Sequence, residues 1–256
     1  MSQQSPSGSS DVVQAYWMPG CSSCLRMKEF ISQSGRDWVE INADHPEVRA
    51  ELEQVGILVP AARVGDRWVN GVDLAAVADL LGVPYSPPVM LSPEDLADRY
   101  TLNLGVARAM IGQMTDEMLA HELPGRHRRM LDVACQVASV MRSFLSAYHD
   151  DRHDIVFYST PDAVRTREDV LDRLDATQAA FTTWWEQDGI DDPLDRVTET
   201  YWGYRTLHEI LEREVWHTTQ HLRQLEYVLR KFGVTPAVPL TDANLAGLPL
   251  PAGIHD

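Results

Sequence analysis

Two cysteines separated by two residues are the first candidates for chemistry in this chain. Cys21 and Cys24 lie in the segment WMPGCSSCLRMK, after an apolar run and a Pro-Gly turn, and one other cysteine occurs, Cys135. A CxxC pair can bind a metal, belong to a disulfide framework or act as a redox couple. Three cysteines cannot form a framework, and no second CxxC or CxxH completes a zinc site. The spacing therefore favours a redox pair over zinc or two inert core cysteines.

The second candidate group lies in the segment TLHEILEREVWHTTQHLRQLEYVLRKFG near the end of the chain. At helical spacing, Glu214, His217 and His221 fall on the apolar stripe of this segment. Two histidines four residues apart can share one metal ion. Polar groups on a buried face need either a partner or a metal, so hydrogen bonding across the core remains the alternative.

The elements that position the cysteines follow from the first eighty residues. Strand patterns at 12–17 and 37–42 alternate with helical patterns, one that ends at Gly35 and one that Asp44 is expected to cap at 45–55. A hairpin at 60–70 and a helix at 73–81 complete the order β-α-β-α-β-β-α. Cys21 would then lie at a helix N-terminus, where the helix dipole favours the thiolate, which is the attacking species in disulfide exchange.

This order, with CxxC at the first strand-to-helix turn, resembles the thioredoxin fold. The motifs WMPGCSSC and ILVPAARVGDRWVNG resemble those of glutaredoxins, over residues 11–83. The resemblance implies that Cys21 attacks a disulfide, that Cys24 resolves the mixed disulfide, and that a cis proline lies against the two sulfurs. The residues that it implies for substrate binding are Pro19, Val59, Pro60, Asn70 and Gly71.

A proline-rich linker, 84–92, separates this region from a second one in which strand signals nearly vanish. Apolar residues recur at spacings of three and four, which predicts a four-helix bundle over 93–235. The overall fold class is therefore α/β plus all-α. An extended segment is expected at 236–256 and a disordered tail at 1–10. The expected bundle helices span 93–122, 128–148, 166–185 and 206–233.

Residues 93–250 resemble the DinB-like four-helix bundles, a family that includes metal-dependent transferases of low-molecular-weight thiols. The segment WHTTQHLRQLEYVL resembles their last-helix motif, whose two metal-binding histidines map onto His217 and His221. Their third ligand, usually a histidine, maps onto Gln136. An amide is a poor ligand for zinc. Either Glu214 or Cys135 substitutes, or the site is weak or empty, and Cys135 can equally be a small buried hydrophobe.

Composition narrows the range of partners. Acidic residues outnumber basic ones 38 to 22, which gives a formal net charge of −16 and disfavours nucleic acid and anionic membranes. The segment MSQQSPSGSS has neither a basic region nor an apolar stretch, so we expect no signal peptide and a cytoplasmic location. The expected partner is a small-molecule thiol, and the bundle is a candidate surface for a homodimer.

The whole chain resembles a glutaredoxin–DinB fusion of the kind found in actinobacteria, whose main small thiol is mycothiol. Three functions remain open. The first is a thiol–disulfide oxidoreductase whose bundle binds mycothiol, a similar thiol or a thiolated small molecule, and the CSSC motif favours it. The second is a thiol transferase that depends on zinc or another divalent metal, against which Gln136 counts. The third is a redox-sensing interaction protein, which has no sequence feature of its own.

Overall fold

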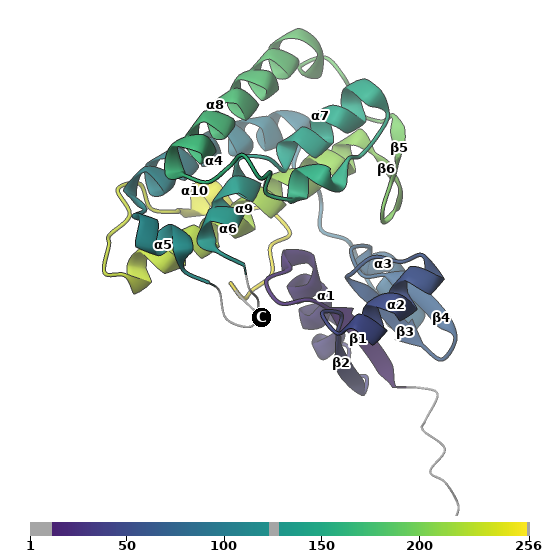
Figure 1. Ribbon diagram of the computed structural model, residues 1–256. Coiled ribbons are helices and arrows are strands. Elements are labelled where there is room, and N and C mark those ends of the chain that lie inside the picture. The colour runs from purple at the N-terminus through teal and green to yellow at the C-terminus, as the bar shows by residue number, and fades with distance from the viewer. Residues whose placement is uncertain (1–11, 123–127, 255–256) are drawn as a thin grey trace, which may run out of the picture. The chain divides into compact units, whose positions relative to one another are not determined.

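The computed structural model describes residues 12–122 and 128–254 (Figure 1). The described residues form two compact units, with the division between Pro87 and Pro88. The tail expected at 1–10 lies outside the described residues. Each unit is considered by itself below.

The first unit is built on a four-stranded mixed sheet in the order β2-β1-β3-β4. β1 is parallel to β2 and antiparallel to β3, which is in turn antiparallel to β4. This topology and the order β-α-β-α-β-β-α confirm the sequence-based expectation and are consistent with a thioredoxin-like fold. The strands are β1 (Val13–Trp17), β2 (Trp38–Asn42), β3 (Ala61–Val64) and β4 (Arg67–Asn70).

Side chains on β1 alternate between two apolar clusters, as the period of a strand requires. Val13 and Ala15 pack in one cluster with residues of α1 and α3, whereas Tyr16 packs in the other with Leu52 of α2. The sheet therefore has a core on both faces. The helices are α1 (Ser22–Gln33), α2 (Pro46–Val55) and α3 (Leu74–Leu81).

The expected cap of α2 is wrong by one residue. His45 is the N-cap and makes no capping hydrogen bond with its side chain, and Pro46 takes the first helical position. Asp44 instead forms an ion pair with Arg49, in which Oδ1 lies 3.5 Å from Nη2. Proline fixes a helical φ without needing a hydrogen-bond acceptor, so this helix begins without a side-chain cap.

The second unit is helical (Figure 1). α9 packs against α4, α6 and α7, and α8 packs against the same three helices. The apolar stripes predicted from the sequence therefore meet in a shared core. The helices are α4 (Pro93–Gln113), α5 (Asp116–Ala120), α6 (Met130–Val137), α7 (Met141–Asp150), α8 (Arg167–Trp184) and α9 (Leu207–Lys231), with short turns of helix at η1 (Ile155–Tyr158) and η2 (Trp185–Gly189).

Two of the expected long helices are interrupted. The helix expected at 93–122 breaks after α4, because the hydroxyl of Thr115 accepts from the N–H of Met118 at 3.3 Å and caps α5. The helix expected at 128–148 breaks between α6 and α7. There the buried hydroxyl of Thr177 donates to the carbonyl of Ala138 at 2.7 Å, so α8 satisfies backbone that the helix leaves free.

The second unit also contains an antiparallel hairpin, β5 (Val197–Thr200) and β6 (Gly203–Thr206), where no strand was expected. Thr198 and Thr200 are buried, and the residues between and before them are exposed. The hairpin leads directly into α9, where the hydroxyl of Thr206 accepts from the N–H of Glu209 at 3.2 Å. The hairpin thus fixes the start of the helix that carries the candidate metal ligands.

The last described residues, up to Ile254, make hydrogen bonds with helices of the second unit. The segment expected to be extended contains a short helix, α10 (Asp242–Leu245). Carbonyls near residues 251–254 accept hydrogen bonds from Gln220, Arg223 and Gln224 of α9. Among the described residues, no helix combines the length and apolarity that a bilayer crossing requires.

Candidate functional site

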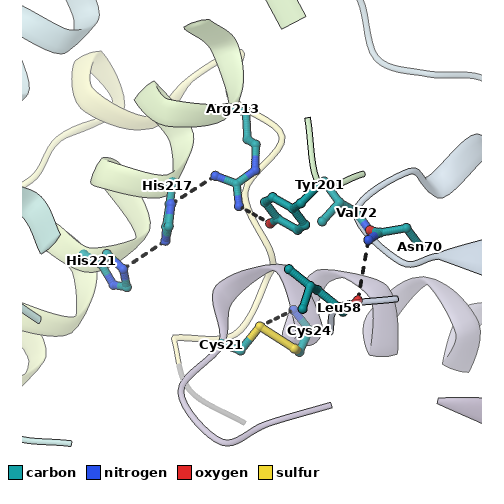
Figure 2. The surroundings of a disulfide bond; sticks show 9 residues. All are labelled: Cys21, Cys24, Leu58, Asn70, Val72, Tyr201, Arg213, His217 and His221. Carbon is teal, nitrogen blue, oxygen red and sulfur yellow. Dashed lines mark hydrogen bonds between the residues drawn. A yellow bond between two sulfur atoms is a disulfide. The ribbon is translucent and has the colours of Figure 1, made fainter. Parts of the chain in front are cut away.

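The pair Cys21–Cys24 lies at the start of α1, joined as a disulfide (Figure 2). The N–H of Cys21 donates to the carbonyl of Met18 at 3.3 Å, and Gly20 has a positive φ of 68°, which glycine adopts readily. Cys21 is the N-cap of α1, and its sulfur accepts from the N–H of Cys24 at 3.2 Å. The local chain therefore aims the backbone N–H of Cys24, in the first turn of the helix, at the Cys21 sulfur.

The two cysteine residues differ in their exposure to solvent. Cys24 is fully buried, whereas Cys21 is partly exposed. The first turn of α1, all of which the structure describes, carries no acidic side chain that would oppose a negative charge. A reagent from solvent can reach Cys21, and the helix N-terminus stabilises its thiolate.

The residues implied for substrate binding lie in three places. Val59 and Pro60 precede β3, Asn70 and Gly71 lie at the end of β4, and Pro19 lies in the turn before Cys21. The peptide between Val59 and Pro60 is cis, and the carbonyl of Pro60 accepts from the N–H of Gly71 at 2.7 Å. The side chain of Asn70 donates to the carbonyl of Leu58 at 3.5 Å (Figure 2). Pro19 is buried in the turn. Binding of a substrate by these residues stays a prediction.

In the second unit, Glu214, His217 and His221 face the interior, as expected from the apolar stripe. They belong to a larger connected group, which we call the core polar cluster. Besides these three residues, it contains the buried Arg213 of α9, and His153, Tyr158 and Tyr201 from outside the helix.

Glu214 is the fully buried centre of the core polar cluster. Its Oε1 accepts from the hydroxyl of Tyr158 at 2.6 Å and lies 3.1 Å from Nε2 of His153. Nη1 of Arg213 donates to Oε1 at 3.2 Å and to Oε2 at 3.3 Å. Burial raises the pKa of Glu214, but the charge of Arg213 and the hydrogen bond from His153 outweigh burial and hold the pKa well below its ordinary value. Glu214 is therefore a carboxylate.

Arg213 keeps its charge in spite of being buried. Burial opposes the charge, but the oxygens of Tyr158, Tyr201 and Glu214 outweigh it and raise the pKa of Arg213. Nη1 donates to the hydroxyl of Tyr158 at 2.9 Å, and Nη2 donates to that of Tyr201 at 2.8 Å. The arginine and the glutamate thus form a buried ion pair in which both Nη atoms of the arginine donate hydrogen bonds.

The two histidines extend this network along α9 (Figure 2). Nδ1 of His217 lies 3.1 Å from Nη1 of Arg213, and its Nε2 lies 3.1 Å from Nε2 of His221. Nδ1 of His221 lies 2.8 Å from Oε1 of Gln224. Burial lowers the pKa of His217 to about 4, although Glu214 opposes this shift. His217 is therefore neutral near pH 7.

The candidate ligands on α6 have other contacts. The amide of Gln136 donates to the backbone carbonyl of Tyr158, and the sulfur of the fully buried Cys135 lies 3.8 Å from the hydroxyl of Ser139. Over residues 12–122 and 128–254, no three His, Cys, Asp or Glu side chains are grouped as a metal site would need. Metal binding by the candidate ligands, Cys135, Gln136, Glu214, His217 and His221, stays a prediction from the sequence.

Sequence reasoning missed four members of the core polar cluster: Arg213, His153, Tyr158 and Tyr201. Arg213 directly precedes Glu214, and a charged residue beside the apolar stripe of a helix is usually solvated. The other three come from segments without helical periodicity. The only available signal was that a buried carboxylate needs a cationic partner.

Comparisons with known proteins place this chain in no family. No protein-family model matches the sequence, and no curated protein matches it. One solved structure that it matches is a glutathione S-transferase from Xanthobacter autotrophicus Py2. That match has 14% sequence identity and a TM-score of 0.30, and it covers 86% of this chain and 87% of the other. A likeness at this level supports no argument about fold or activity.

Proposed function

We propose that the first unit is a glutaredoxin-type thiol–disulfide oxidoreductase that works through Cys21 and Cys24. The observation that carries the proposal is the position of the pair. Cys21 caps α1 with its sulfur and is a partly exposed residue, whereas Cys24 lies one turn further and is fully buried. That asymmetry suits an attacking thiol and a resolving thiol.

The reaction proceeds in two exchanges that balance. The thiolate of reduced Cys21 attacks a substrate disulfide, so one substrate thiol leaves and a mixed disulfide with Cys21 forms. The thiolate of Cys24 then attacks the Cys21 sulfur, which releases the second substrate thiol and leaves the Cys21–Cys24 disulfide. Two molecules of a low-molecular-weight thiol restore the dithiol and become a disulfide themselves, so two electrons pass in each half-reaction.

The surroundings of Cys21 support its role as the attacking group. In the disulfide, the sulfur of Cys21 accepts a hydrogen bond from the N–H of Cys24. The same N–H can stabilise the Cys21 thiolate after reduction. The helix N-terminus adds its partial positive charge. For the substrate, we assign Pro19, Val59, Pro60, Asn70 and Gly71 to the surface that holds the thiol compound against the sulfurs.

The second unit is proposed to be a DinB-like bundle that binds the low-molecular-weight thiol, mycothiol or a similar compound, or a thiolated small molecule. Its packing of α8 and α9 against α4, α6 and α7 is compatible with this assignment. The assignment of the redox chemistry to the first unit does not depend on it.

An activity assay on cysteine variants tests the proposal. The full chain is given a small disulfide and a thiol reductant, and reduction is followed for wild type, Cys21→Ser and Cys135→Ser. Cys21→Ser should lower the rate by at least about a thousandfold, because the nucleophile is gone. Cys135→Ser is the matched control, since Cys135 is a buried free thiol, and it should keep the wild-type rate. A Cys21→Ser variant with near wild-type activity would refute the proposal.

A further inference from the structure

The histidines that the sequence assigns to a divalent ion lie beside a buried arginine. Nη1 of Arg213 is 3.1 Å from Nδ1 of His217 and 3.2 Å from Oε1 of Glu214. We propose that the core polar cluster is a metal-free hydrogen-bond relay, in which the guanidinium of Arg213 supplies the positive charge that the sequence assigns to a metal. Arg213 is then the positioning residue for His217 and, through it, for His221.

Arg213 fixes the proton positions of both histidines. A guanidinium only donates hydrogen bonds, so Nδ1 of His217 accepts and carries no proton. Because Nδ1 carries no proton, His217 carries its proton on Nε2 and donates it to Nε2 of His221 at 3.1 Å. His221 in turn carries its proton on Nδ1, which donates to Oε1 of Gln224 at 2.8 Å. The relay therefore has one direction, from Arg213 to Gln224.

The hydrogen bonds of Gln224, at the far end of the relay, run in the same donor-to-acceptor direction. With Oε1 of Gln224 accepting from His221, its Nε2 donates to the carbonyl of Ile254 at 3.2 Å. Every polar atom from Nη1 of Arg213 to this carbonyl thus has a partner of the right kind. A run of buried hydrogen bonds in which each donor meets an acceptor favours one arrangement of its side chains.

This donor set does not fit a divalent ion. A metal at Nε2 of His217 would use the lone pair of that nitrogen and force the proton onto Nδ1. The nearer neighbour of Nδ1 is the donor Nη1 of Arg213, at 3.1 Å, whereas the acceptor Oε2 of Glu214 lies at 3.6 Å, so a proton on Nδ1 would point at a donor. The lone pair of Nε2 of His221 is also engaged, because it accepts from His217.

Charge leads to the same conclusion. Arg213 and Glu214 neutralise each other, and His217 and His221 are neutral in the relay. A divalent ion would add two positive charges beside a guanidinium in a buried site, where charge repulsion is weakly screened. Both carboxylate oxygens of Glu214 are already engaged: Oε1 accepts from Tyr158 and Arg213 and contacts His153, and Oε2 accepts from Arg213 at 3.3 Å.

Nuclear magnetic resonance of the wild-type full chain tests the relay directly. Long-range ¹H–¹⁵N spectra distinguish the two neutral histidine tautomers, and the signals are assigned with His217→Gln and His221→Gln variants. We expect the Nε2–H tautomer for His217 and the Nδ1–H tautomer for His221 near pH 7. Finding His217 as the Nδ1–H tautomer would overturn the proposal.

Zinc titration provides the second test. Zinc is added to the metal-stripped, untagged full chain, and heat and histidine signals are recorded. Wild type should show no stoichiometric binding at His217 and His221, whereas Arg213→Gln should bind zinc at least about tenfold more tightly. Arg230→Gln is the control, because Arg230 is an exposed arginine of the same helix whose partner is Glu226, and it should behave as wild type.

Each result of the titration decides the matter. Stoichiometric zinc binding by wild type that shifts both histidine signals would contradict the relay. A folded Arg213→Gln that binds no better than wild type would show that Arg213 does not exclude the ion. If Arg213→Gln fails to fold, the tautomers and zinc response of the wild type still decide. None of these outcomes bears on the redox activity of Cys21 and Cys24, which belong to the other unit.

Discussion

Single residues of identical type acquire different chemistry from their positions. Cys21 caps α1 and is partly exposed, whereas Cys24 is inside the helix and fully buried. His217 and His221 differ in a similar way, because Arg213 lies against the first and Gln224 against the second. At this scale, the partner of each atom decides its protonation state and therefore its role.

Acid should destabilise the second unit through His217. Its pKa falls from 6.5 to about 4 on folding, so between these values the unfolded chain binds more protons than the native one. Stability is therefore complete above pH 6.5 and declines as the pH falls towards 4, by up to about 3 kcal/mol. Glu214, whose pKa is lowered, adds to this loss below about pH 4.5, its ordinary value. Denaturant unfolding at several pH values measures the slope.

The control for this pH dependence is His217→Gln, which removes the titrating group. Between pH 6.5 and 4.5, the variant should show a shallower decline than wild type, because the carboxylate of Glu214 contributes little there. Equal slopes in wild type and variant would mean that His217 is not the group responsible.

Sequence reasoning placed Glu214, His217 and His221 in the interior of the helical unit, since helical periodicity is a local property. It could not identify Arg213 as their partner. The hydroxyls that let a buried arginine keep its charge come from Tyr158 and Tyr201, which no local pattern brings to α9. Contacts of this kind are set by tertiary packing, which one sequence does not reveal.

At the scale of elements, the candidate redox site depends on close packing between α1 and the segment after β4. Gly71 lies where an added Cβ would meet Met27 of α1 and come within 2.9 Å of Cβ of Pro60. The N–H of Gly71 also donates a hydrogen bond to the carbonyl of Pro60 at 2.7 Å. The glycine is therefore required by space, because the helix that carries the cysteines approaches the backbone here.

Gly71→Ala should destabilise the first unit by about 1–3 kcal/mol, since the added methyl overpacks a fixed contact. Gly105→Ala is the control, because Gly105 is exposed in α4 and a Cβ there meets nothing within 4 Å. That change should stabilise the chain by about 0.5–1 kcal/mol through helix propensity. Calorimetry of the full chain compares the two. A neutral Gly71→Ala would show that α1 and the segment after β4 can move apart freely.

The sequence predicted the elements of the first unit well, because each strand is a short apolar run between turn residues. It predicted the long helices of the second unit but not their interruptions. In the sequence, Thr115 and Ala138 look like ordinary helix positions. Thr115 is the N-cap of α5, and the carbonyl of Ala138 accepts from Thr177 of α8, so both interruptions depend on neighbouring helices. The hairpin of β5 and β6 was missed because its turn lacks an Asn-Gly or Asp-Gly pair.

At the scale of the whole molecule, the chain joins two units of different architecture. Each unit buries its own apolar residues, so each can hold its candidate site in place. The net charge of −16 concerns the whole chain, and from it we expect polyanions to be poor partners. The redox proposal belongs to the first unit and the metal-free relay to the second, so their tests are independent.

Trapping of the mixed disulfide tests the central claim most directly. Reduced Cys24→Ser and Cys21→Ser forms of the full chain are each mixed with oxidised glutathione as the probe disulfide, and adducts are located by peptide mass spectrometry over time. Cys24→Ser should accumulate one adduct, on Cys21, because the attacking thiol remains and the resolving thiol is gone. Cys21→Ser should react far more slowly, because Cys24 is fully buried. An adduct on Cys24 that forms as fast as the one on Cys21 would contradict the account.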